Sequence, residues 1–355
     1  MIFRQFFEPV SSSYTYLLAA RKGGEALLID PVLERVDRYI RLLDELDLRL
    51  VKVFDTHVHA DHITGMGALR DRTKCITIMG EQSPVDVVSV RVGDGDSIDI
   101  EGLSLDAMYT PGHTIDSYCL RMADRVFTGD TLLIRGTGRT DFQGGSSHDA
   151  YDSLFNKLLT LPDETLVYPG HDYKGDTVST IGEERAHNPR LKVGSAEEYA
   201  AIMDNLNLPN PKMMDVAVPA NVAIGRGQGV ARHAAWALTA DQVMDQCNAA
   251  DVALVDLRDA SEREAHGVIP GSVHAPYTGL DSLIRPGGML REMIGTTGRR
   301  LIYYCAFGER SAMAVESSQE CGLDNVCHLI GGIDAWRKAG GPIEVPGEGA
   351  TRSLV

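Results

Sequence analysis

The sequence lacks a long hydrophobic run. No stretch of about 18 apolar residues occurs in its 355 residues, and two charged residues, Arg4 and Glu8, interrupt the apolar N-terminal segment. A helix needs ~20 predominantly apolar residues to cross a membrane, and a signal peptide needs an uninterrupted apolar segment. We therefore expect neither a signal peptide nor a membrane span, and no membrane partner.

The sequence is also poor in positive charge. It has 34 Lys and Arg residues against 50 Asp and Glu residues, which gives a net charge of −16. A protein this acidic repels the phosphate backbone of DNA and RNA. We exclude nucleic acid as a main partner.

Cysteines are few and irregularly spaced. Six of them in 355 residues fit free thiols in a reducing compartment better than a disulfide framework, which predicts a soluble cytoplasmic protein. The length and the 43% hydrophobic content suffice for the packed cores of about two domains. The cysteines are Cys75, Cys119, Cys247, Cys305, Cys321 and Cys327.

What the sequence does contain is a dense cluster of histidines in FDTHVHADHITG, residues 54–65. An apolar run leads into it and a glycine follows, which predicts a buried strand that ends in a loop. Three histidines and an aspartate within six residues suit zinc or ferrous iron. The alternative, ordinary core or surface histidines, is common for a single histidine but not for such a group. The residues are His57, His59, Asp61 and His62.

The same pattern, an apolar run followed by a metal-binding residue type, recurs three more times. His113, Asp130 and His171 each follow a predicted strand and a glycine. Functional groups of α/β folds gather at strand ends in this way. We predict that these residues join the first cluster in one metal site. We also expect one strand over residues 97–109 and one helix over about 151–159.

The composition changes after residue 204. Residues 205–236 are rich in Pro and Gly with little helical period, so we predict a connection there. GRGQG within it would be a phosphate cradle only if a strand led into it and GK[ST] followed, and neither holds. Alternating strands and helices over residues 237–345 predict a small α/β domain with a parallel sheet. We thus expect domains at 1–204 and 237–345, and a tail at 346–355.

In this second domain, Cys305 lies where an apolar strand ends and a helix begins, with AFGE between it and Arg310. The loop N–H groups, the helix dipole and the arginine favour a negatively charged sulfur, so we predict that Cys305 and Arg310 are catalytic. The alternative is a buried inert cysteine, which we expect for Cys75, Cys119 and Cys247.

The motif THVHADH, together with His113, Asp130 and His171, resembles the signature of the metallo-β-lactamase fold superfamily over residues 1 to about 200. Within it, GDTLLIRGTGRTDFQGG and YPGHDYKG are similar to persulfide dioxygenases. The resemblance implies an αββα sandwich and one Fe(II) per chain, held by His57, His113 and Asp130. The other members of the cluster would orient these ligands or form a second metal site: His59, Asp61, His62 and His171.

The same resemblance implies where glutathione binds. Arg139 and Tyr173 match residues that lie near glutathione in the family, and Phe142 would line the same pocket. A guanidinium can pair bidentately with a glutathione carboxylate. The alternatives are a surface ion pair for Arg139 and a packed aromatic ring for Tyr173.

Three segments of the second domain together resemble a rhodanese over residues 238 to about 343: DLRDASEREAHGVIPGSVHAP, CAFGERSAMA and LIGGIDAWRKAGGPI. Rhodaneses carry sulfane sulfur as a cysteine persulfide, here on Cys305. The alternative is a phosphatase of related architecture, which has one more residue between its cysteine and arginine. Asp256, Arg258 and Glu262 match a structural ion-pair region, so we expect no catalytic role for them.

These resemblances imply a fusion of two enzymes. The first domain would oxidise glutathione persulfide with O₂ to sulfite and glutathione, and the second would exchange sulfane sulfur between thiosulfate and glutathione persulfide. One alternative is a glyoxalase II-like binuclear zinc thioester hydrolase with an accessory rhodanese domain. Another is a sulfide-binding regulatory protein without turnover. A homodimer is compatible with the sequence.

Overall fold

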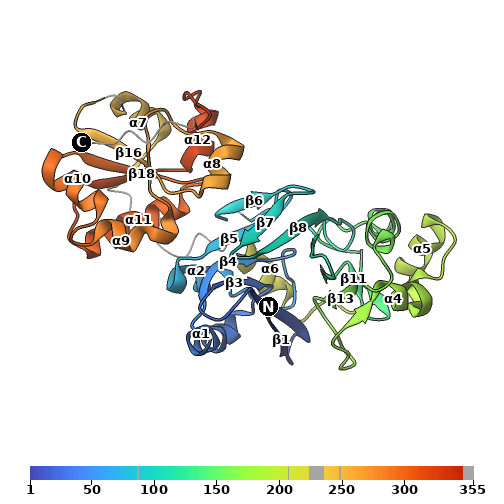
Figure 1. Cartoon of the computed structure of the whole chain (residues 1–355). Helices are drawn as coiled ribbons and strands as arrows, with labels where there is room; N and C mark the ends of the chain where they lie inside the picture. Colours follow the sequence, from blue (N-terminus) through green and yellow to red (C-terminus); the bar gives the residue numbers. More distant parts are fainter. Residues whose placement is uncertain (86–87, 207, 224–235, 248, 347–355) are drawn as a thin grey trace. The chain divides into compact units, whose positions relative to one another are not determined.

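The computed structural model describes residues 1–85, 88–206, 208–223, 236–247 and 249–346. The chain forms two compact units, residues 1–86 with 90–224 and residues 87–89 with 225–355 (Figure 1). None of the helices in the described ranges is long and apolar enough to span a membrane.

The first sheet of the first unit contains six strands among the described residues, in the order β1-β2-β3-β4-β5-β6. Strands β1 to β3 are antiparallel neighbours, and β3 to β6 run parallel. The RKGG segment, residues 21–24, turns between β2 and β3. The strands are β1 (Ile2–Glu8), β2 (Ser13–Ala19), β3 (Glu25–Ile29), β4 (Arg49–Phe54), β5 (Ile76–Gly80) and β6 (Val90–Val92).

The second sheet has the order β14-β13-β10-β9-β8-β7. The prediction of one strand over residues 97–109 is wrong, because the chain turns at Gly102, whose φ of 73° favours glycine, and β7 pairs with β8 as a hairpin. The strands are β7 (Ser97–Ile100), β8 (Leu103–Tyr109), β9 (Tyr118–Arg121), β10 (Arg125–Gly129), β13 (Leu166–Pro169) and β14 (Ser179–Thr180).

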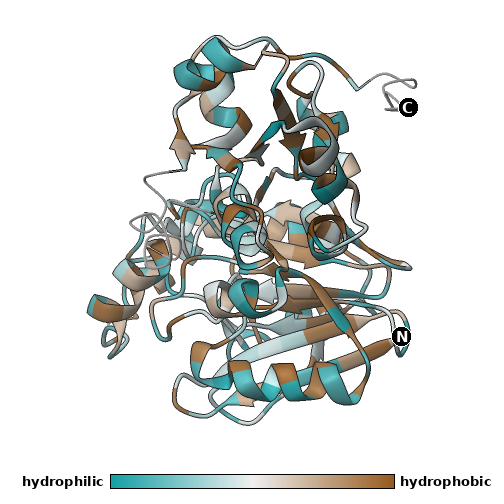
Figure 2. Cartoon of the chain, turned by 90° about the vertical axis from the view of Figure 1, so that its left-hand side faces the viewer, coloured by the Kyte–Doolittle hydropathy of each residue, from teal (hydrophilic) through white to brown (hydrophobic). Residues whose placement is uncertain are grey.

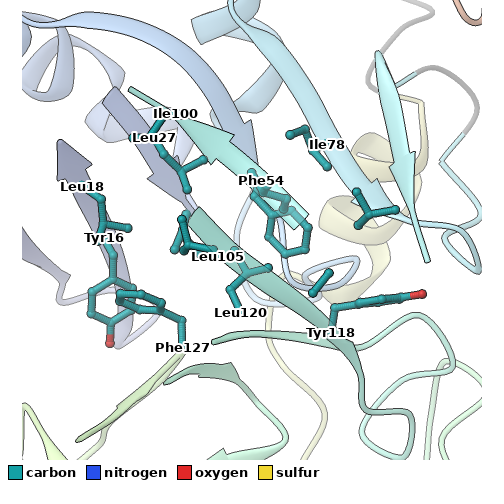
Figure 3. Close-up of a cluster of buried hydrophobic side chains, with 14 of the residues drawn as sticks. Tyr16, Leu18, Leu27, Phe54, Ile78, Ile100, Leu105, Tyr118, Leu120 and Phe127 are labelled. Carbon is teal, nitrogen blue, oxygen red and sulfur yellow. The ribbon is translucent and has the colours of Figure 1, made fainter. Parts of the chain in front are cut away.

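The hydrophobic core of the first unit lies between these two sheets. Side chains of alternate strand residues point into it from both sides, as strand geometry requires. Figure 3 shows part of this core, with Leu18, Leu27, Phe54 and Ile78 from the first sheet and Ile100, Leu105, Tyr118, Leu120 and Phe127 from the second.

Helices cover the outer faces of both sheets, which confirms the predicted four-layered αββα sandwich (Figure 1). The Tyr39 hydroxyl of α1 lies 2.9 Å from that of Thr15 on β2, and α2 packs on β4 and β5. Figure 2 shows hydrophilic and hydrophobic residues mixed along the helices, and α1 buries Val36, Tyr39 and Leu43. They are α1 (Val36–Glu45) and α2 (Met66–Thr73) on the first sheet, and α3 (Ser147–Asp152), α4 (Ile181–His187) and α5 (Ala196–Met203) on the second.

Two predictions about helices need correction. The segment expected as one helix is α-helical only in α3 and continues as a π-helix (Ser153–Lys157) and a 3₁₀ turn (Leu158–Thr160). The range 205–236, expected as a connection without helical period, contains helix α6 (Met214–Val222) of the first unit. The sequence does not predict this helix because it contains Pro219, and proline disfavours a helix interior. The domain boundary stays a prediction, since 224–235 lie outside the described residues.

The second unit contains a parallel sheet of order β15-β19-β18-β16-β17 with helices on both faces, which confirms the predicted small α/β domain (Figure 1). Helices α9, α10 and α11 cover one face, and α7 and α12 cover the other. The elements are β15 (Ala237–Leu238), α7 (Ala240–Gln246), β16 (Val252–Asp256), α8 (Ala260–His266), β17 (Val273–His274), α9 (Leu280–Ile284), α10 (Met289–Thr297), β18 (Arg300–Tyr304), α11 (Glu309–Glu320), β19 (Val326–Leu329) and α12 (Gly332–Lys338).

Candidate metal centre and cysteine loop

Four strand ends of the first unit carry the histidines and the aspartate that the sequence singles out. In the second sheet β8 and β10 flank β9 as antiparallel neighbours, and β10 pairs with β13 in parallel, so the C-terminal ends of β8, β10 and β13 lie at one edge. His113, Asp130 and His171 follow these ends, and His57 follows β4 of the first sheet.

Three of these side chains form a compact group. One nitrogen each of His57 and His113 and one carboxylate oxygen of Asp130 lie within 4.8 Å of one another, and all three residues are buried. Nε2 of His113 lies 3.6 Å from Oδ2 of Asp130. Two imidazole nitrogens and a carboxylate oxygen are a ligand set for a divalent transition metal, and for non-haem iron in particular. The residues present therefore fit a metal ion.

Hydrogen bonds on the far side of each imidazole set which nitrogen faces the group. Nδ1 of His113 donates to the Arg139 carbonyl oxygen at 2.7 Å. Nδ1 of His57 donates to Oγ1 of Thr56 at 2.9 Å, because that hydroxyl itself donates to Oδ2 of Asp30 at 3.0 Å. Metal-binding histidines are oriented in this manner, and both Nε2 atoms remain for a ligand.

His171 holds Asp130 in place. Its Nδ1 donates to Oδ1 of Asp130 at 2.6 Å, and its Nε2 donates to Oδ2 of Asp61 at 2.9 Å. Burial alone would lower the pKa of His171, but the two carboxylates outweigh it and raise that pKa well above its usual value. Burial likewise would raise the pKa of Asp130, which His171 and the neighbouring histidines hold below its usual range.

Two glycines allow this close packing. A Cβ atom on Gly138 would lie 2.2 Å from the Asp130 carbonyl oxygen and 2.8 Å from Cγ of His113. One on Gly170 would lie 2.7 Å from Oδ1 of Asp130. The glycines of GTG and PGHD therefore serve the site directly. Gly138 follows the small hairpin of β11 (Leu132–Leu133) and β12 (Gly136–Thr137).

The other residues of the histidine-rich loop form a second group. Ligand atoms of His59, Asp61 and His62 also lie within 4.8 Å of one another. Nε2 of His59 donates to Oδ1 of Asp30 at 3.2 Å, and Nδ1 of His62 donates to Oδ2 of Asp61 at 2.8 Å. Nδ1 of His59 and Nε2 of His62 are buried without a hydrogen-bond partner in the described part of the chain.

A cavity of about 240 Å³ opens in front of the first group. The predicted glutathione contacts all line it. Phe142 meets the His113 ring edge-on at 5.6 Å between centroids, and Tyr173, 72% exposed, stacks over His171 at 6.0 Å. The lining also includes His57, Asp61, Asp130, Arg135, Arg139, Lys174 and Arg190.

The cations of this cavity differ in their partners. The Arg139 guanidinium binds both oxygens of Asp141, at 2.6 and 2.7 Å, and donates to the Pro209 carbonyl at 2.7 Å. Arg135 pairs with Glu184. Within the described residues, Arg190 and Lys174 have no carboxylate at ion-pair distance. Arg139 thus forms an ion pair with a partner two residues away in the sequence.

In the second unit, Cys305 follows β18 and its side chain is 1% exposed. The Gly308 N–H donates to the Cys305 Sγ at 3.1 Å, as expected for a loop that cradles sulfur. Arg310 is fully buried, and both terminal nitrogens bind the Glu262 carboxylate, at 2.6 and 2.8 Å. Its Nη2 also donates to the Ser89 carbonyl oxygen at 2.9 Å. Burial alone would lower the pKa of Arg310, but Glu262 raises it above its usual value.

Other residues of the second unit lie as the sequence indicates. Arg258 is buried and pairs with Asp256 at 2.8 Å, a structural ion pair. Glu262 has a role that the sequence does not reveal, since it both caps α8 and holds Arg310 of the cysteine loop. All six cysteines are free.

Known proteins share both halves of this architecture. The family model of the metallo-beta-lactamase superfamily matches residues 9–84 and 79–171, and that of the rhodanese-like domain matches residues 239–339. The chain is therefore a metallo-β-lactamase-fold protein with a C-terminal rhodanese-like domain. A metallo-beta-lactamase structure from Staphylococcus aureus, 20% identical, shares the fold with a TM-score of 0.59 over 92% of this chain and 98% of its own.

Closer relatives define the particular family. The mitochondrial persulfide dioxygenases ETHE1 of Homo sapiens and Mus musculus are 49% and 48% identical over 228 residues, which are 63% of this chain and 89% of theirs. The crystal structure of ETHE1 from Myxococcus xanthus is 56% identical, with a TM-score of 0.62, over 63% of this chain and all of that one. The chain belongs to the persulfide dioxygenase family and is an enzyme with a metal site.

Sequence reasoning missed several residues of the site. Thr56 and Asp30 orient His57, and only the first of them is a sequence neighbour. Arg190 enters the cavity from a 3₁₀ turn (Pro189–Leu191) that carries no motif. Lys174 lies within the quoted YPGHDYKG, so its position beside Tyr173 could have indicated it.

Proposed function

We propose that the first unit oxidises glutathione persulfide with O₂ and water to glutathione and sulfite at one Fe(II), held by His57, His113 and Asp130. The outer sulfur loses four electrons and O₂ gains four, so that GSSH, O₂ and H₂O give GSH, SO₃²⁻ and two protons. The observation that carries this proposal is the buried group of two imidazoles and one carboxylate that faces a cavity in a persulfide dioxygenase homologue.

Iron in such a ligand set has open positions and would bring the persulfide and O₂ together and activate O₂. The protein's own groups keep that site in order. His171 holds one oxygen of Asp130 and leaves the other for the ion. The imidazole of His171 lies between two carboxylates, where it can retain or release a proton at Nε2 next to the cavity.

The hydrogen bonds around Asp61 support one metal ion over two. Its Oδ2 already accepts from both His62 and His171, and both nitrogens of His171 are engaged by carboxylates. The unpartnered nitrogens of His59 and His62 favour the second candidate, a binuclear zinc thioester hydrolase, because a second ion would satisfy them.

For the substrate, the cavity supplies two aromatic rings and two cations, of which Arg190 also donates to the Thr137 carbonyl oxygen. Glutathione carries two carboxylates, and Arg190 and Lys174 are the lining cations that have no acidic partner among the described residues. We propose that these two bind the carboxylates, while Phe142 and Tyr173 contact the peptide. Arg139, which the sequence favours for this role, shapes the cavity through its bonds to Asp141 and Pro209.

In the second unit we propose sulfur transfer through Cys305. The Cys305 thiolate attacks the outer sulfur of thiosulfate, the S–S bond breaks, and sulfite leaves. A glutathione thiolate then takes the sulfur from the Cys305 persulfide, which regenerates the thiolate and gives glutathione persulfide; the reverse sequence uses the same bonds. The Gly308 N–H beside Sγ and the four-residue interval to Arg310 support sulfur over the larger phosphate.

The free cysteines support a reducing compartment, and we propose the cytoplasm as the site of action.

The decisive experiment on function combines metal analysis of anaerobically purified protein with oxygen uptake on glutathione persulfide. We expect one iron per chain and oxygen uptake. Two zinc ions per chain with hydrolysis of an acyl-glutathione would establish the thioester hydrolase. Iron-loaded protein without oxygen uptake would point to regulatory binding, and phosphate release from an aryl phosphate by Cys305 to a phosphatase.

A further inference from the structure

Helix α6 places a polar side chain against the histidine-rich loop. One face of α6 carries residues at helical spacing: Met214, Ala217, Val218 and Asn221. Asn221 occupies a buried position of this face, where an apolar residue would be usual. Asn221 is 2% exposed. Its amide is therefore buried, and a buried amide needs hydrogen-bond partners.

All these partners are backbone groups of the loop. Nδ2 of Asn221 donates to the carbonyl oxygens of His59 and His62, each at 2.9 Å, and Oδ1 accepts from the Thr64 N–H at 2.9 Å. Both amide donors and the acceptor are in use. One side chain thus fixes the backbone on either side of Asp61, from a helix more than 150 residues later in the chain.

The fixed loop leads to the metal group through two further contacts. Asp61, held between the clamped residues, accepts from Nε2 of His171 at 2.9 Å, and Nδ1 of His171 donates to Asp130 at 2.6 Å. A shift of the loop would therefore move Asp61, then His171, then the carboxylate. Asn221 itself does not line the cavity.

We propose that Asn221 is a positioning residue of the metal centre, and that α6, which directly precedes the change to the second unit, is thereby a part of that centre. The proposal builds on the proposed function in that His57, His113 and Asp130 hold the ion. It adds that the order of this site depends on a segment outside every metal-binding motif of the sequence.

The test uses the full chain and Co²⁺ alone as the probe, because Co²⁺ reports its coordination by visible absorption and needs no turnover. In Asn221→Ala we expect Co²⁺ binding to weaken ~10-fold and the absorption bands to change, as for loss of groups that orient ligands. Asn221→Asp keeps the size but offers no N–H to the two carbonyls, so we expect the same change. Asn205→Ala is the matched control, because Asn205 is an exposed asparagine of the first unit whose amide donates to the Ala201 carbonyl at 2.7 Å.

Further readouts separate positioning from general damage. With iron and glutathione persulfide, kcat should fall while KM stays unchanged, and sulfur transfer through Cys305 should persist. Unchanged Co²⁺ affinity and spectrum in folded Asn221→Ala and Asn221→Asp would overturn the proposal. Hydrogen exchange tests the same contacts without a variant. The Thr64 N–H of the wild-type chain should exchange slowly, because it is bonded to Oδ1 of Asn221. Fast exchange would contradict this hydrogen bond and overturn the proposal.

Failure of the proposed function would look different. If the iron-loaded wild type consumes no O₂ with glutathione persulfide, the dioxygenase assignment fails. The difference in Co²⁺ binding between wild type and the two Asn221 variants would still decide the positioning role.

Discussion

The two sites of this chain differ in how far apart their parts lie in the sequence. The metal group takes its side chains from positions 57, 113 and 130, and the residues that orient them range from Asp30 to Asn221. The sulfur site centres on residues 305–310, and the distant partners of Arg310 are the Glu262 carboxylate and the Ser89 carbonyl oxygen.

This difference has a consequence for robustness. A dispersed site forms only when two sheets, their connecting loops and α6 are all correctly folded and packed. A change far from the ion can therefore disturb it. A contiguous loop needs mainly its own strand and helix. We therefore expect the first site to respond to many substitutions and the second to few, which the following changes can test.

The largest expected effect comes from His113→Ala. Removing one of three ligands should reduce bound iron and lower oxygen uptake on glutathione persulfide by more than ~100-fold, since loss of even a group that orients a ligand costs 10- to 100-fold. Sulfur transfer should be unaffected. Metal analysis and oxygen uptake of the variant measure this, and full iron occupancy would show that the ligand set is wrong.

Cys305→Ser is the mirror experiment. Replacing the sulfur removes the atom that carries sulfane sulfur, so transfer from thiosulfate should fall to background while oxygen uptake stays within about twofold of wild type, because Cys305 belongs to neither the metal group nor its cavity. Loss of both activities in a folded variant would contradict the independence of the two sites.

The sequence predicts where most site residues lie along the chain but few of their contacts. It predicts the strand ends before His57, His113 and Asp130, because hydrophobic periodicity and turn signals are local. It does not predict the pairing of Arg310 with Glu262, since this pairing joins segments 48 residues apart. Arg139 shows an intermediate case: its partner Asp141 is visible two residues on, yet only the structure shows that the pair forms.

The Arg310 pair provides the next test. Glu262→Gln keeps the helix-capping acceptor but leaves the buried guanidinium uncompensated, which should destabilise the second unit by about 3–5 kcal/mol. Both tryptophans, Trp236 and Trp336, lie in that unit, so denaturant unfolding followed by fluorescence reports it selectively.

Lys338→Gln is the control for this experiment. It breaks an exposed pair with Asp334 in the same unit, and the transition should hardly move. A substrate-binding role of Arg310 alone would show the opposite pattern for Glu262→Gln, namely an altered KM for thiosulfate with little change in stability.

A smaller effect distinguishes the cations of the cavity. Arg190→Gln should raise KM for glutathione persulfide about 10-fold with little change in kcat, because a charge-assisted bond to a carboxylate is lost. Arg139→Gln should raise it less, since Asp141 already occupies that guanidinium. The reverse order of the two KM values would restore Arg139 as the carboxylate ligand.

The smallest expected effect concerns pH and the second unit alone. Burial raises the pKa of Tyr303 to about 12, against a small opposing effect of its 2.8 Å hydrogen bond to Ser318. An unfolded tyrosine loses its proton near pH 10, so between about pH 10 and 12 the unfolded chain binds fewer protons and stability falls as pH rises. One such group contributes a slope of at most ~1.4 kcal/mol per pH unit to the free energy of unfolding.

Tyr303→Phe should therefore reduce the loss of stability at alkaline pH that tryptophan fluorescence reports. Tyr199 lies in the first unit, and burial raises its pKa to about 12 as well, so Tyr199→Phe should leave that signal unchanged. An equal effect of both variants would mean that the two units unfold together, and the contrast between a dispersed and a contiguous site would then not extend to their stability.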